Sequence, residues 1–103
     1  MLAGRDDLVT VIDGSASTKT DDQVLSDAPA ALAKYVGGTL GPMTYSASGS
    51  AMGREFVLSR PGRPQSRVRL FVWHKHLYEL IAESSLGPDD PENEAFLTSF
   101  RLT

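Results

Sequence analysis

The sequence predicts an α+β fold, in which a mainly antiparallel sheet of about five strands carries two helices in the order β-α-β-β-β-β-α. Two observations lead to this prediction. Residues 67–73 and 77–83 are rich in β-branched and aromatic side chains and are separated by three residues, which is typical of a β-hairpin. Residues 24–36 instead repeat apolar side chains every three or four positions, which is typical of a helix packed on a sheet. A chain of 103 residues is expected to form one domain, residues 1–103.

The first predicted element is a strand over residues 8–12 (LVTVI), followed by a polar loop over 14–19. A helix should then begin at Thr20, where Gln23 completes a capping box, and should end at the Gly-Gly pair after residue 36. Pro29 lies inside this pattern, and a proline in a helix interior bends the helix. We expect one helix kinked near Pro29. The alternative is an irregular turn over 21–26 and a shorter helix capped by Asp27.

The remaining elements follow from turn residues and alternating patterns. We expect a short Pro-bearing edge strand over 40–46, a turn over 47–52, a strand over 54–60 and a Pro-Gly loop over 61–66. After the hairpin, residues 84–90 should form a loop. A last helix should be capped by Asp90, begin at Pro91 and end near Arg101.

The hairpin carries apolar side chains on both of its faces. On its first strand, one face should hold Val68, Leu70 and Val72, and the other Arg67, Arg69, Phe71 and Trp73. Such a sheet is either covered on both sides, or covered on one side and docked to a partner on the other. The register depends on whether the loop around His74-Lys75-His76 has two or three residues, and a slip of one residue exchanges the faces.

The composition excludes several classes of function. There is no cysteine, which excludes disulfides, thiolate metal sites and cysteine nucleophiles. A net charge of −3 argues against nucleic acid as a partner. No apolar run is long enough for membrane insertion, and the N-terminus lacks the pattern of a signal peptide, so the sequence assigns no compartment. No motif specifies a reaction or a cofactor.

Arginine is concentrated in the middle of the chain, at Arg54, Arg60, Arg67 and Arg69 among others. Acidic residues dominate both ends of the chain. One interpretation is that the arginines pair with acidic neighbours, so that Glu79 pairs with Arg69 and Glu83 with Arg67 across the hairpin. The other is an anion-binding surface.

Two further features are candidate binding sites. Trp73 and Phe71 beside Arg67 and Arg69 form either an exposed aromatic and basic patch, as is common at binding hot spots, or part of a core under a helix. His74 and His76 could hold a divalent metal. Two ligands make a weak site, however, so an exposed turn is the simpler interpretation and no metal is expected.

Four segments of the second half of the chain form a recognisable pattern: GREF at 53–56, RVRLFV at 67–72, LYELI at 77–81 and FLTSFRL at 96–102. With the glycine pair that ends the first helix, this pattern resembles a small bacterial domain that is frequent in planctomycetes. That family is similar in architecture to the PsbP-like fold and supplies no catalytic residues. The family turn is often Gly-Asn, where this chain has His74-Lys75. The family also tends to have more strand sequence before the first helix.

The resemblance therefore implies that an N-terminal strand segment is missing here, which would leave a sheet edge open to a second copy. We expect a non-enzymatic interaction or structural module that self-associates through this edge or through the Trp73 face. The expected partner is a second copy or another protein. The alternative is a small-ligand or anion-binding domain that uses Arg54, Arg60, Arg67 and Arg69, and a minor alternative is a hydrolase.

Overall fold

The computed structural model describes residues 5–14, 18–48 and 51–100. It is an α+β structure with five strands and two helices, in the order that the sequence predicts. The elements are β1 (Arg5–Asp13), α1 (Asp21–Val36), β2 (Thr39–Ser48), β3 (Ala51–Ser59), β4 (Ser66–Trp73), β5 (His76–Ser84) and α2 (Pro91–Ser99).

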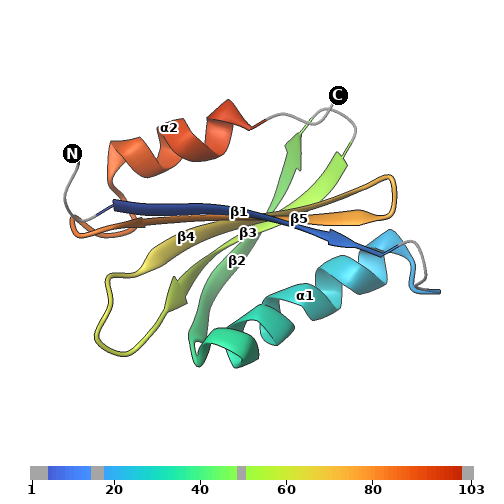
Figure 1. Cartoon of the computed structure of the whole chain (residues 1–103), viewed down its shortest axis with the longest axis horizontal. Coiled ribbons are helices and arrows are strands. Elements are labelled where there is room, and N and C mark those ends of the chain that lie inside the picture. The colour runs from blue at the N-terminus through green and yellow to red at the C-terminus, as the bar shows by residue number, and fades with distance from the viewer. Residues whose placement is uncertain (1–4, 15–17, 49–50, 101–103) are drawn as a thin grey trace.

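The five strands form one antiparallel sheet in the order β1-β5-β4-β3-β2. Helices α1 and α2 lie on its opposite faces (Figure 1). The edge position predicted for residues 40–46 is confirmed, because β2 is the last strand. Strands β2 and β3 extend into the turn predicted over 47–52 and pair as far as Ser48 and Ala51. Residues 49–50 of that turn, and 15–17 of the predicted loop over 14–19, lie outside the described residues.

The hairpin between β4 and β5 has a two-residue turn. Trp73 pairs with His76, and the two residues between them, His74 and Lys75, have φ angles of 51° and 66°. Positive φ at both central positions gives the turn a twist that matches the twist of the strands. This turn fixes the register that the sequence left open, and it places the β4 side chains on the two faces as predicted.

Helix α1 begins and ends where its capping residues predict. The Thr20 side chain accepts a hydrogen bond from the Gln23 backbone at 3.2 Å, and the Gln23 side chain accepts one from the Thr20 backbone at 2.9 Å. Gly37 takes the left-handed conformation after the last turn, with φ of 70°. The helix runs through Pro29, so the alternative of a shorter helix capped by Asp27 is wrong. A kink at Pro29 stays a prediction.

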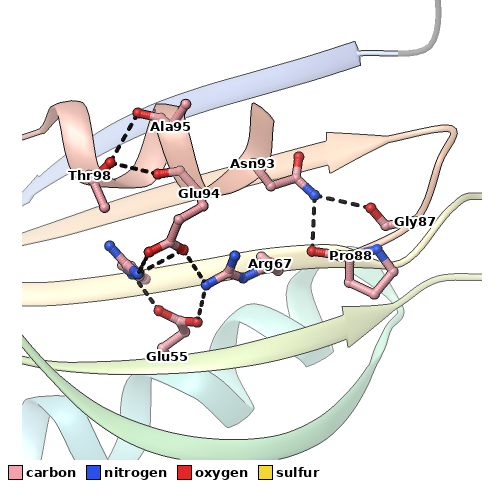
Figure 2. Close-up of polar contacts among 9 residues, drawn as sticks. Glu55, Arg67, Gly87, Pro88, Asn93, Glu94, Ala95 and Thr98 are labelled. Atoms are coloured by element: carbon pink, nitrogen blue, oxygen red, sulfur yellow. Dashed lines mark hydrogen bonds and ion pairs between the residues drawn. The ribbon is translucent and has the colours of Figure 1, made fainter. Parts of the chain in front are cut away.

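Helix α2 is held by polar groups as well as by its apolar side. The Asp90 side chain accepts hydrogen bonds from the Glu92 backbone at 3.0 Å and from the Ser84 hydroxyl. The buried Asn93 amide donates to the carbonyls of Gly87 and Pro88 at 3.1 and 3.2 Å (Figure 2). The helix ends at Ser99, and the end predicted near Arg101 falls outside the described residues. Neither described helix has the length and apolar character needed to span a membrane.

Each helix covers part of one face of the sheet, and a separate core lies under each. Helix α1 contacts β2, β3 and β4, whereas α2 contacts β5. The core under α1 contains Leu25, Leu32, Phe56, Leu58, Val68, Leu70 and Val72. The core under α2 contains Ala51, Phe71, Leu80, Ala82 and Leu97. On the α1 side, β5 and β1 therefore extend beyond the main contacts of the helix.

Gly53 on β3 allows the strands under α2 to approach closely. A Cβ atom at this position would lie 2.5 Å from the Leu70 carbonyl oxygen and 2.6 Å from the Phe71 ring. Any larger residue would have to displace the backbone of β4, so the glycine of the GREF segment has a packing role.

Candidate functional site

The arginines at the centre of the sheet are paired with carboxylates. Arg67 lies between two of them, at 2.5 Å from Glu55 on β3 and 2.7 Å from Glu94 on α2 (Figure 2). Arg69 also bonds to Glu55, and it lies 3.2 Å from Glu94. This Arg–Glu cluster of four residues connects β3, β4 and α2 on one face of the sheet.

The charges of the cluster stabilise one another. Burial alone would raise the pKa of the Glu94 carboxyl, but the hydrogen bond from Arg67 and the positive charges of Arg69 and Arg67 lower this pKa overall. Burial acts against the charge of Arg67, yet Glu55 and Glu94 raise the pKa of its guanidinium. Both arginines therefore already have anionic partners within the chain.

Glu83 at the end of β5 forms a second cluster with the loop after β3. Its carboxylate lies 2.6 Å from both Arg60 and Arg63, and the Ser66 hydroxyl donates to it at 3.3 Å. The Glu83 side chain is only 7% exposed. Burial would raise the pKa of this carboxyl, but the hydrogen bonds and charges of Arg63 and Arg60 lower it overall.

The predicted pairing of Glu79 with Arg69 and of Glu83 with Arg67 is wrong. The register sets Arg69 opposite Leu80 and Arg67 opposite Ala82. Since directly opposed residues share a face, both arginines point to the α2 side of the sheet, while Glu79 and Glu83 point to the α1 side. The broader expectation, that the basic middle strands pair with acidic residues, agrees with both clusters.

Arg54 lies apart from these clusters. Its guanidinium carbon is 4.4 Å from the centre of the Tyr45 ring on β2, which is a cation–π contact. An N–H of the same guanidinium donates a hydrogen bond to the Gly53 carbonyl at 3.0 Å. The four arginines of the expected anion-binding surface therefore lie in three places, each with a partner. The structure brings Arg67 and Arg69 together but leaves Arg54 and Arg60 apart from them.

Phe71 and Trp73 belong to the side of the sheet that α2 covers. Phe71 is 2% exposed and stacks on Phe100 with ring centres 6.4 Å apart. Trp73 is half-buried at the margin of the same core, and its ring stacks on His74 at 4.0 Å. Phe71 therefore belongs to the core under α2, which is one of the two interpretations of this patch. Its ring is not available as a binding surface.

The two histidines do not face each other as metal ligands. His74 lies in the turn, whereas His76 is the first residue of β5 and its Nδ1 lies 2.8 Å from the His74 carbonyl oxygen. The His76 Nε2 is 3.9 Å from an Asp13 oxygen. Among the described residues, no group of three or more histidine, aspartate or glutamate side chains is placed to hold a metal ion.

Strand β1 is the most apolar exposed element of the sheet. Leu8 is 52% and Val11 51% exposed, and Val9 and Ile12 are nearly as open. Leu8 and Ile12 share the α1 face, while Val9 and Val11 share the other face. Both faces of this edge strand therefore present apolar side chains to solvent.

The backbone of β1 also has an open side. The Gly14 amide donates to the Lys75 carbonyl at 2.7 Å, which places a hydrogen-bonded pair at the end of the ladder between β1 and β5. Such pairs recur at every second residue of an antiparallel ladder, so Thr10 bonds to β5 while Val9 and Val11 direct their N–H and C=O groups outward. No described strand lies on that side.

A groove lies between α1 and the sides of β5 and β1 that face the same way as this helix. It has a volume of about 560 Å³, and its walls are mostly apolar. Glu79 lies on its floor beside Thr10. The sequence did not predict this groove, because Glu79 was expected to pair with Arg69. The available signal was a single carboxylate between the apolar Leu77 and Ile81, on the side of the strand that faces a helix.

Comparisons with known proteins add no identity. No protein family matches the sequence, and neither a curated protein nor a solved structure is detectably similar to it. The resemblance to a PsbP-like planctomycete domain therefore stays a prediction.

Proposed function

We propose that the protein is a non-catalytic interaction module that self-associates by pairing β1 with β1 of a second copy. The observation that carries this proposal is the position of β1 at the sheet edge, with apolar side chains half-exposed on both faces. An open, apolar edge strand favours the addition of another strand. The lack of a sequence motif for a reaction supports the non-catalytic part.

Two copies of β1 can pair antiparallel so that apolar residues lie opposite apolar residues. If two copies pair antiparallel about Thr10, Leu8 lies opposite Ile12 and Val9 lies opposite Val11. This register also matches the outward N–H and C=O groups of Val9 with those of Val11. Such a two-fold axis would join two five-stranded sheets into one continuous sheet.

The opposite edge of the sheet is less suited to this role. Its strand β2 contains a register shift between Leu40 and Met43, where the chain includes Gly41 and Pro42. Proline and irregular pairing protect sheet edges against strand addition. The proposal therefore assigns self-association to β1.

A lysine substitution tests the proposed edge. Val9→Lys places a charge in the apolar contact and should weaken the dimer by about tenfold, measured by sedimentation velocity over a series of protein concentrations. Thr44→Lys is the matched control, because Thr44 is exposed on the opposite edge strand and on the same face of the sheet as Val9.

Two results would overturn the proposal. The first is a protein that stays strictly monomeric at the highest concentration reached. The second is a dimer that Val9→Lys and Thr44→Lys weaken equally, since the dimer would then not depend on β1.

A further inference from the structure

We infer that the groove between α1 and strands β5 and β1 is a binding site for a small apolar amine, with Glu79 as the group that receives the ammonium. This inference goes beyond self-association and does not depend on it. The proposed strand pairing uses the backbone edge of β1, whereas the groove opens on the face of the sheet.

The position of α1 creates the groove. The helix packs on β2, β3 and β4, so the α1 sides of β5 and β1 form a floor next to the helix. Leu32, Tyr35 and Val36 form the wall on the helix, and Leu8, Ile12 and Ile81 belong to the floor. A volume of about 560 Å³ falls within the usual range for sites that hold small ligands, about 300–1,000 Å³.

Glu79 places a carboxylate among the mostly apolar residues that line the groove. No hydrogen bond or ion pair joins its side chain to another described residue. Burial raises the pKa of its carboxyl, and no positive charge in the part of the chain that the structure describes opposes that effect. A cationic ligand would supply the missing charge where water is partly excluded.

The other titratable groups of the lining do not compete for this role. Arg60 also lines the groove, but its guanidinium forms an ion pair with Glu83 at 2.6 Å. Tyr35 stands at the helix wall and is 81% exposed. The lining therefore combines an apolar cavity with one uncompensated carboxylate, which is the complement of an apolar body that carries one amine.

Three ligands with the same indole body test the charge preference. Tryptamine carries a cation, tryptophol a neutral hydroxyl and indolepropionate an anion. We expect tryptamine to bind about tenfold more tightly than tryptophol, because a hydrogen bond to a charged group is stronger than a neutral one. Indolepropionate should bind most weakly. Titrations followed by backbone NMR shifts measure the affinities and locate the site.

Two variants and one control assign the preference to the groove. Glu79→Gln keeps the shape of the side chain and should abolish the advantage of tryptamine over tryptophol while both still bind. Ala31→Trp should block both ligands, since Ala31 is an exposed lining residue of α1 and the new ring would fill the cavity. Glu92→Gln on α2 removes the same charge from the other side of the sheet and should change nothing.

Several outcomes would overturn the inference. The first is that the unmodified protein binds tryptamine and tryptophol with equal affinity. This measurement does not depend on whether any variant folds. Others are NMR shifts outside the groove and a charge preference that survives Glu79→Gln. Tryptamine binding that disappears as the protein dimerises would show that a second copy occupies the groove instead.

Discussion

At the scale of single residues, Glu83 is the ionisable group on which stability should depend most. Glu83→Gln leaves the guanidinium of Arg60, which is 18% exposed, without its anionic partner. We expect a loss of about 1.5–3 kcal/mol in the free energy of unfolding at neutral pH. Urea denaturation measures this loss, and Asp89→Asn in the exposed loop before α2 is the control for the change in net charge.

The pH dependence of this effect follows from the sign of the pKa shift. Folding lowers the pKa of the Glu83 carboxyl, so its contribution is complete above the ordinary carboxyl pKa and is lost as the pH falls through the lowered value. The difference between the protein and Glu83→Gln should therefore shrink in acid. A difference that stays constant down to the acid limit would contradict the assigned ion pairs.

The residues of both clusters could be predicted as charged and paired, but their partners could not. Which carboxylates share a face of the sheet with Arg67 depends on the register between β4 and β5, and that register depends on the length of the turn at His74 and Lys75. Glu94 adds a second uncertainty, because it reaches the sheet only through the docking of α2. Long-range pairs of this kind require the tertiary structure.

At the scale of the elements, the turn between β4 and β5 carries backbone strain. Lys75 has a φ of 66°, a conformation that costs a residue with a side chain about 1 kcal/mol or more. Lys75→Gly should raise the free energy of unfolding by about 0.5–1 kcal/mol, since glycine takes positive φ freely. Thermal unfolding is the measurement. Lys75→Ala removes the same charge without relieving the strain and should give no such gain.

The sequence predicted the type and order of the elements better than their ends. Thr20, Gln23 and Gly37 form local capping motifs, and local motifs can be recognised without the rest of the fold. The ends of β2 and β3 consist of small residues such as Ser48 and Ala51, which favour a turn by composition. Pairing between the two strands continues through them because the antiparallel ladder, rather than side-chain propensity, holds them.

At the scale of the whole molecule, the sheet has two helices that cover different strands. The two-sided apolar pattern of residues 67–83 left open whether the chain covers both faces of the sheet or a partner covers one of them. Helix α2 covers Phe71 within the chain. The position of α1 over β2, β3 and β4 was not predictable, because the stripe on a helix indicates that it packs but not which strands it covers. The groove beside Glu79 results from that position.

The pairing of β1 with β5 also bears on the order in which the protein folds. Strands β2 to β5 are neighbours in the chain and can pair through short loops, but β1 reaches β5 only across most of the sequence. Closing so long a loop is slow, so β1 should join the sheet last and leave it first. In amide hydrogen exchange on the monomer, Thr10 should lose protection before Leu70 at the centre of the sheet. Equal protection at both positions would mean that the sheet opens only as a whole.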